Sequence, residues 1–111
     1  MLNVLESIPY NDQTMGRRQL VSEKHLLLLQ IALKPGQVVP THNANSNVHL
    51  LVLQGSIDVT LNDAPYQAGS GSLLAVALGT SMQIRNTQAH NATFLVIKTP
   101  NPSEIKTAQL K

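Results

Sequence analysis

The sequence predicts an all-β domain, either a sandwich or a barrel of antiparallel strands. Short apolar or alternating runs recur along the chain and turn residues bound them, whereas no stretch keeps the three-and-four spacing of an amphipathic helix. Six or more short strands at nearly even spacing are typical of sandwiches and barrels. At 111 residues the chain is long enough to enclose one core, and we expect a single domain over residues 1–111.

The expected strands follow from local patterns. The run from Ser56 to Leu61 alternates between apolar and polar side chains, so Ile57 and Val59 share one face of a strand. The other runs are mostly apolar and end at turn signals such as Lys34-Pro35-Gly36. We expect strands over residues 26–33, 48–53, 56–61, 72–77, 82–86 and 93–98. Residues 101–111 are expected to form a C-terminal tail, whose first residues have the pattern of a capped short helix.

The composition argues against several classes of function. A net charge of +2, with no basic run longer than Arg17-Arg18, gives little attraction to nucleic acid, and the scarcity of aromatic residues removes stacking platforms. The chain has no cysteine, so it has neither a thiolate metal site nor a cysteine nucleophile. No apolar run approaches the roughly 20 residues of a membrane helix, and residues 1–10 lack the pattern of a signal peptide. We therefore expect a cytoplasmic protein with no nucleic-acid or membrane partner.

Two spaced patterns connect these strands to a known family. In the first, Gly36 is followed after five residues by His42, and the pattern closes at Gly55. In the second, Gly71, Gly79 and Asn86 follow one another at fixed spacing. Together the patterns resemble, without insertions, the two motifs of the cupin superfamily. The resemblance implies a jelly-roll β-barrel of two antiparallel sheets, with its core over residues 24–100.

The resemblance also implies where a cupin metal would sit. Cupins hold a divalent metal through two histidines and a glutamate of the first motif and one histidine of the second. Here those positions hold His42, Ala44, Val48 and Met82, so only the first retains a ligand. The resemblance therefore implies that the usual metal site is mostly lost, and we expect no cofactor. Strand parity and the motif alignment predict a barrel interior lined by Leu27, Leu29, Ile31, Val48, Leu50, Val52, Met82, Ile84, Phe94 and Val96.

An altered set of histidines leaves a divalent transition metal open as an alternative. His49 follows Val48 and so points to the opposite face of a regular strand, although a β-bulge would turn it inward. His25 shares the parity of Leu27, so it either lines the inner face near one end or forms hydrogen bonds at the rim. His90 lies in a polar turn and is expected to be solvated.

The polar segment after the first motif histidine is the leading candidate for a ligand site. Asn43, Asn45 and Asn47 alternate with small residues, and with His42 and Met82 they predict a hydrogen-bonding cluster at the barrel mouth. The alternative is a polar loop in which these amides satisfy the backbone locally.

The sequence thus supports three classes of function. The first is a small cupin that needs no metal, has no catalytic role and binds a small molecule or acts as an accessory or sensor protein. The second is a metal-dependent cupin enzyme of the dioxygenase or isomerase type, with an altered ligand set around His42 that includes His49 or His25. The third is a structural module that acts through its dimer surface. Small cupins are commonly homodimers, and residues 1–21 are the expected contributors to such an interface.

Overall fold

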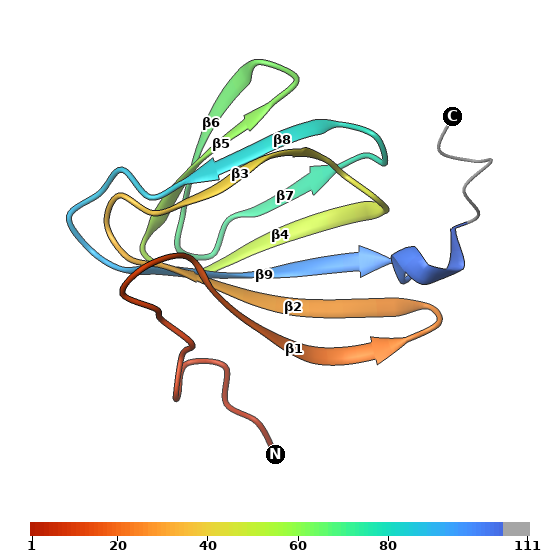
Figure 1. The fold of residues 1–111 in the computed structure, drawn as a ribbon, viewed down its shortest axis with the longest axis horizontal. Coiled ribbons are helices and arrows are strands. Elements are labelled where there is room, and N and C mark those ends of the chain that lie inside the picture. The colour runs from red at the N-terminus through yellow and green to blue at the C-terminus, as the bar shows by residue number, and fades with distance from the viewer. Residues whose placement is uncertain (106–111) are drawn as a thin grey trace.

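The computed structural model describes residues 1–105. These residues form nine strands, arranged in two facing antiparallel sheets, and one short 3₁₀ helix (Figure 1). The expected all-β jelly-roll barrel is confirmed. The strands are β1 (Gly16–Glu23), β2 (Leu26–Leu33), β3 (Val38–Asn43), β4 (Asn47–Gln54), β5 (Ser56–Leu61), β6 (Ala64–Gly69), β7 (Leu73–Val76), β8 (Ser81–Arg85) and β9 (Ala92–Thr99). The helix η1 spans Pro102–Glu104. Over residues 1–105 the chain forms no helix long and apolar enough to cross a membrane.

The sheet order is not the order of the sequence. One sheet has five strands in the order β1-β2-β9-β4-β7, and the other has four in the order β3-β8-β5-β6. The chain therefore passes from sheet to sheet, and β9 returns to lie between β2 and β4 (Figure 1). Because β9 pairs along its whole length on both sides, it forms the centre of the larger sheet.

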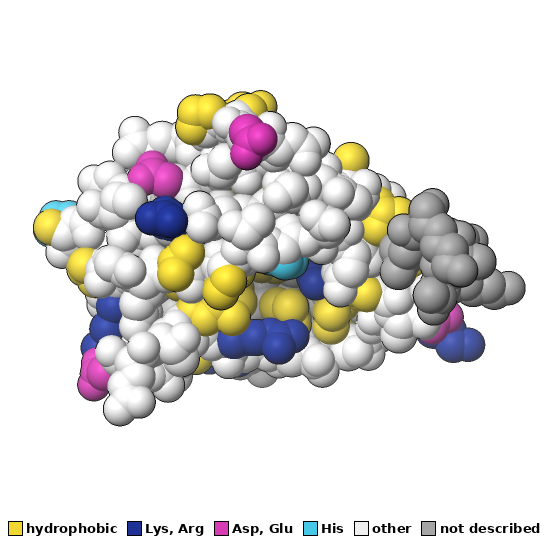
Figure 2. All heavy atoms as spheres, turned by 45° about the horizontal axis from the view of Figure 1, so that its top comes forward, with side chains coloured by type: hydrophobic (Ala, Val, Ile, Leu, Met, Phe, Trp, Pro, Cys, Tyr) yellow, Lys and Arg dark blue, Asp and Glu magenta, His cyan; other side chains and the backbone are white. Residues whose placement is uncertain are grey.

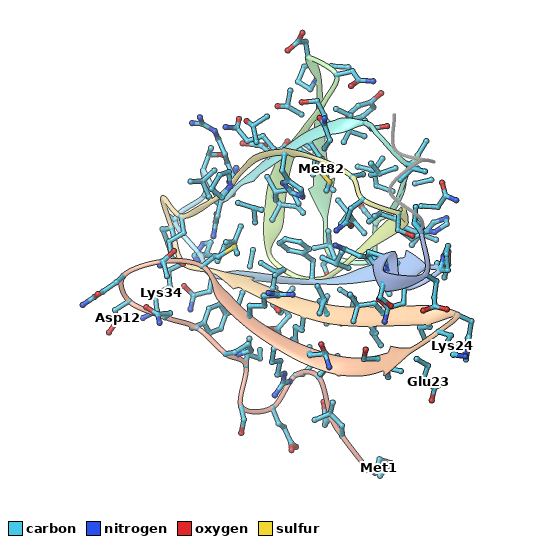
Figure 3. The ribbon with its side chains drawn as sticks, turned by 45° about the vertical axis from the view of Figure 1, so that its right-hand side comes forward. Met1, Asp12, Glu23, Lys24, Lys34 and Met82 are labelled. Atoms are coloured by element: carbon cyan, nitrogen blue, oxygen red, sulfur yellow. The ribbon has the colours of Figure 1, made fainter. Side chains whose placement is uncertain are left out.

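The core lies between the two sheets and consists of the side chains expected from strand parity. Phe94, Leu50 and Val52 from the larger sheet meet Ile57, Val59 and Ile84 from the smaller one, and each is at most 2% exposed. The predicted interior is confirmed, except that Leu27 is only partly buried against the core. Figure 3 shows Met82 between the sheets, whereas the charged side chains Asp12, Glu23, Lys24 and Lys34 lie at the periphery.

Three strands were not among those expected from the sequence. The barrel was expected to begin at residue 24, but the larger sheet already includes β1, whose polar run Arg17-Arg18-Gln19 conceals an edge strand. The strands β3 and β6 are also edge strands with mostly exposed residues. An edge strand buries few side chains, so the apolar pattern that marks a central strand is weak in all three.

The N-terminal segment crosses the outer face of the larger sheet. The buried Gln30 donates from Nε2 to the Val4 carbonyl (2.8 Å) and to Thr93 Oγ1 (3.0 Å). The Arg18 guanidinium donates to Gln30 Oε1 (2.8 Å) and to the Ser7 carbonyl (3.1 Å). Because these bonds satisfy an amide that is 0% exposed, they fix the segment against β2. At the other end, Asn101 caps η1, and residues 106–111 of the expected tail lie outside the described residues.

The glycine that closes the first motif is required by its surroundings. Gly55 has φ of +78°, and a Cβ at this position would lie 2.4 Å from the Asn91 carbonyl oxygen. Any other residue would therefore be strained and would also push β9 away.

Candidate functional site

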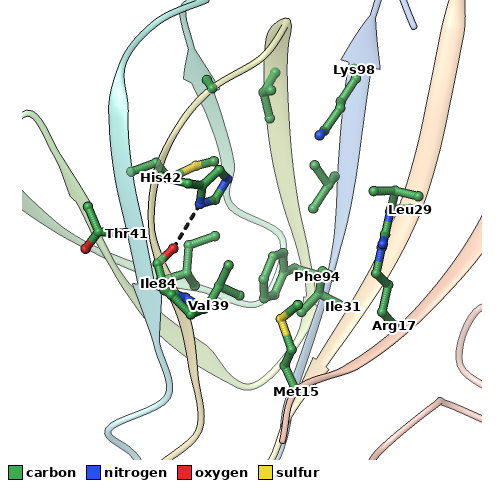
Figure 4. Close-up of a pocket in the computed structure, with 15 residues that line it drawn as sticks. Met15, Arg17, Leu29, Ile31, Val39, Thr41, His42, Ile84, Phe94 and Lys98 are labelled. Carbon is green, nitrogen blue, oxygen red and sulfur yellow. Dashed lines mark hydrogen bonds between the residues drawn. The ribbon is translucent and has the colours of Figure 1, made fainter. Parts of the chain in front are cut away.

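A cavity of about 330 Å³ opens between the two sheets. Its wall is mainly apolar, as the yellow side chains gathered in a hollow of one face in Figure 2 illustrate. The apolar lining residues are Met15, Leu29, Ile31, Val39, Pro40, Ala44, Val48, Met82, Ile84, Phe94 and Val96. Four polar residues complete the lining, namely Arg17, Thr41, His42 and Lys98 (Figure 4). A concave, mostly apolar site with a few polar groups is the usual form of a small-molecule site.

A register shift in β3 turns His42 toward this cavity. Val39 pairs with Ile84 and His42 with Met82, so three steps along β3 match two along β8. On a regular strand, residues 39 and 42 would face opposite sides, but the irregularity at Pro40-Thr41 lets both line the cavity. Proline is tolerated there because β3 is an edge strand.

The imidazole of His42 is held by its own strand. Its Nδ1 lies 2.9 Å from the Pro40 carbonyl oxygen (Figure 4). Since a carbonyl can only accept, the proton of this hydrogen bond is on Nδ1. The Nε2 atom therefore remains available to a ligand at the cavity mouth.

The four positions to which the resemblance assigned the cupin metal ligands all line the cavity. Ala44, Val48 and Met82 line it beside His42, and each of the three is at most 3% exposed. The four side chains therefore lie together, but they offer a ligand one imidazole, one thioether and two alkyl groups. Within the described part of the chain, no three His, Asp or Glu side chains come together to hold a metal.

The other histidines point elsewhere. His49 is exposed on the outer face of β4, between the buried Val48 and Leu50, because no bulge interrupts the strand there. Strand parity allowed His25 to line an inner face, but the residue lies in the exposed turn between β1 and β2. Its Nε2 is 3.3 Å from a Glu23 carboxylate oxygen. His90 is exposed in the loop before β9, as expected.

The asparagine-rich segment has a mainly structural role in the geometry. Asn47 accepts a hydrogen bond from the Leu78 backbone N–H (3.2 Å), and Asn43 is exposed. Neither lines the cavity, and Ser46 between them is buried and donates to the Pro100 carbonyl (2.6 Å). Asn45 reaches the site indirectly, because its Oδ1 accepts from the Lys98 ammonium at 2.9 Å. Of the five predicted ligand-binding residues, His42 and Met82 line the cavity and Asn45 contacts a lining residue.

Two cationic side chains at the cavity were not predicted from the sequence. Lys98 continues the inward parity of Phe94 and Val96 on β9, so strand alternation was a usable signal for it. Arg17 lies on β1, which pairs with β2 through Ile31 at this point, and the missed edge strand concealed it. Burial of Lys98 lowers the pKa of its ammonium, and the nearby Arg17 charge lowers it further.

Asn86, which ends the second motif, stabilises the fold and does not line the cavity. It is 1% exposed, and its Nδ2 donates to the Leu33 carbonyl (3.0 Å) and the His90 carbonyl (2.8 Å). Its Oδ1 accepts from the Gln88 backbone N–H at 3.0 Å. One amide therefore joins the end of β2 to the loop between β8 and β9.

Comparison with known proteins identifies the class to which this architecture belongs. An uncharacterized protein of Methanocaldococcus jannaschii is 32% identical over 88 residues, which are 78% of this chain and 76% of the relative. The crystal structure of this relative, described as an RmlC-like cupin family protein with a double-stranded β-helix fold, superimposes with a TM-score of 0.77 over 86% of this chain and 88% of that one. The chain therefore belongs to the RmlC-like cupin family.

More distant structures share the fold alone. A Thermus thermophilus protein is 22% identical with a TM-score of 0.83 and covers 90% of this chain and 96% of that one. An uncharacterized Klebsiella pneumoniae protein with a double-stranded β-helix domain is 14% identical, also with a TM-score of 0.83, over 91% of this chain and 90% of that one. No family model matches the sequence.

Proposed function

We propose that this cupin binds a small molecule in its barrel, without a metal and without catalysing a reaction, as an accessory or sensor protein. The observation that carries the proposal is the open cavity beside His42, whose wall is apolar apart from four polar residues. Its volume of about 330 Å³ lies at the small end of the range for ligand sites, roughly 300–1,000 Å³.

The donor set at the cavity supports a role that needs no metal. Stable sites for Zn²⁺, Fe²⁺ or Mn²⁺ use three or more nitrogen or oxygen ligands. The cavity offers His42 alone among such protein ligands, because the alkyl side chains of Ala44 and Val48 have no lone pair and the thioether of Met82 is a poor ligand for these ions. The residues therefore do not fit the metal that the fold family suggests.

The surroundings of His42 also favour binding over catalysis. General acid–base chemistry usually orients a histidine with a carboxylate or a second titratable group. Within residues 1–105 the His42 ring makes one hydrogen bond, to a backbone carbonyl, and none of the residues that line the cavity is acidic. The competing candidate, a dioxygenase-type or isomerase-type enzyme, would need ligands that His49 and His25 do not supply in this geometry.

A matched pair of tryptophan variants tests the binding proposal. Val39 lines the cavity, so Val39→Trp fills it, whereas the neighbouring Val38 is 37% exposed and does not line it. The neutral probe 1-naphthol is titrated into each protein and followed by backbone amide NMR shifts. We expect shifts around the cavity in the wild type and in Val38→Trp, and none in Val39→Trp. Shifts that are scattered over the surface, or that persist in a folded Val39→Trp protein, would contradict the proposal.

We also propose that the protein is a homodimer to which residues 1–21 contribute. The support is exposed apolar surface in this segment, since Leu2 is 57% and Leu5 48% exposed, and β1 leaves one edge of the larger sheet unpaired by described residues. Light scattering at two protein concentrations should give the mass of a dimer, and Leu2→Ser with Leu5→Ser should shift it toward that of a monomer. A wild-type monomer at both concentrations would refute this.

A further inference from the structure

Two positive charges stand at the mouth of an apolar cavity. Lys98 reaches it from β9 and Arg17 from β1, and Figure 4 shows the Lys98 side chain directed toward the space beside His42. Like charges repel each other, and Lys98, which is partly buried, is also penalised by loss of hydration, whereas Arg17 is exposed. This repulsion and the burial together lower the pKa of Lys98. A negatively charged partner would offset the repulsion between the two cations and the loss of hydration of Lys98.

No acidic side chain in residues 1–105 offsets it. Neither Lys98 nor Arg17 takes part in an ion pair of the described chain, and the cavity lining contains no Asp or Glu. The partner that Lys98 does have is the neutral Oδ1 of Asn45, which occupies one of the three ammonium protons. The acidic residues whose side-chain contacts are described lie elsewhere: Asp12 with Lys34, Glu23 with His25, Asp58 with Thr87 and Glu104 with Ser103.

The space below the two cations suits the rest of an amphipathic ligand. Leu29, Ile31, Phe94 and Val96 form an apolar wall on the larger sheet. One water molecule takes roughly 30 Å³ of liquid volume, so a cavity of about 330 Å³ has room for a molecule of roughly ten non-hydrogen atoms of that size. A single aromatic lining side chain offers little ring stacking, so an aliphatic body suits the wall.

Building on the small-molecule role proposed above, we infer that the ligand is a small aliphatic carboxylate whose head group is bound by Lys98 and Arg17 at the cavity mouth. The planar guanidinium pairs with both oxygens of a carboxylate, and the ammonium supplies a second, point-like charge. The alkyl body then displaces water from the apolar wall. Binding neutralises the repulsion between the two cations, so the anion is favoured over a neutral molecule of the same shape.

Octanoate and octanamide provide the matched probes, since both have ten non-hydrogen atoms and differ in charge. Isothermal titration is carried out on the wild type, on Lys98→Met and on Arg17→Met, each of which keeps an apolar stem. Arg85→Met serves as the control, because Arg85 is an exposed cation on β8 that does not line the cavity. We expect octanoate to bind the wild type about ten-fold or more tightly than octanamide.

In each cavity variant we expect octanoate to lose about ten-fold or more in affinity, while octanamide changes by less than about two-fold. The Arg85→Met protein should bind both probes as the wild type does. Equal binding of octanoate and octanamide, or equal losses for both in Lys98→Met, would overturn the carboxylate inference and leave the small-molecule proposal standing. If octanoate, octanamide and 1-naphthol all fail to bind the wild type, the small-molecule proposal itself fails.

Discussion

Replacing Asn86 by alanine should destabilise the barrel without changing the cavity. The substitution removes the two hydrogen bonds that the amide donates to the Leu33 and His90 carbonyls and the one that it accepts from Gln88. The Leu33 carbonyl is inside the protein, and a buried acceptor left unsatisfied costs about 1–3 kcal/mol. His90 is in an exposed loop where water can replace the lost donor, so its bond contributes only about 0.5–1.5 kcal/mol.

The expected loss in the free energy of unfolding is therefore about 2–4 kcal/mol. For a domain of this size, each kcal/mol lowers Tm by about 4–5 °C, which gives a fall of about 8–20 °C. Urea unfolding followed by far-UV circular dichroism measures the first quantity, and a thermal scan measures the second. Asn91→Ala is the control, because its side chain is exposed in the same loop. It should stay within about 0.5 kcal/mol of the wild type.

A second variant separates the hydrogen bonds from the packing. Asn86→Asp keeps the size of the side chain but replaces its two donated protons by a carboxylate that faces two carbonyl oxygens. We expect it to destabilise the protein at pH 7 at least as much as Asn86→Ala does, because one oxygen of a buried carboxylate would face the Leu33 and His90 carbonyls while only the other still accepts from Gln88. If Asn86→Ala costs less than about 0.5 kcal/mol, or if Asn86→Asp is neutral, the hydrogen bonds do not have the role assigned to them.

Three further outcomes are expected. Folding lowers the pKa of Lys98, so the charged ammonium destabilises the folded protein at pH 7. Lys98→Met should therefore raise the urea midpoint at pH 7. The difference in urea midpoint from the wild type should shrink as the pH rises through the folded pKa toward 10.5. Gln30→Ala should cost about 2–4 kcal/mol and free the segment around Val4, with faster proteolytic cleavage there as the readout. Protein purified without chelators should contain far less than one transition metal per chain by elemental analysis, whereas a stoichiometric metal lost in His42→Ala would favour the enzyme alternative.

Strand parity was enough to predict the interior of the barrel. Side chains alternate with a period of two, so a motif position fixed the inward face of each central strand, from Leu29 on β2 to Val96 on β9. The same rule placed His49 outward. Extended two residues along β9 from Val96, it would also have placed Lys98 inward. These residues lie on regular stretches of strand, where no β-bulge disturbs the alternation of side chains.

The rest of the site depends on departures from regular alternation. His42 faces the cavity together with Val39 only because β3 is irregular at Pro40-Thr41, and nothing in the local pattern indicates where the extra residue is accommodated. Arg17 enters the site from an edge strand that has too little apolar content to be recognised. Asn47 satisfies the backbone N–H of Leu78, 31 residues further along the chain in the loop after β7, so its bond is not the local backbone contact that the alternative described.

The residues that the motif resemblance singled out fall into two groups with different physical roles in the barrel. Gly55 is fixed by a positive φ and by the Asn91 backbone, and Asn86 by three hydrogen bonds, so a change at either would cost folding free energy. Ala44, Val48 and Met82 fill space in the core and make no demand for a metal. Apolar side chains at these three positions extend the apolar wall of the cavity. The mouth is then left to His42 and the two cations, the arrangement on which we base the inference of a small anionic ligand.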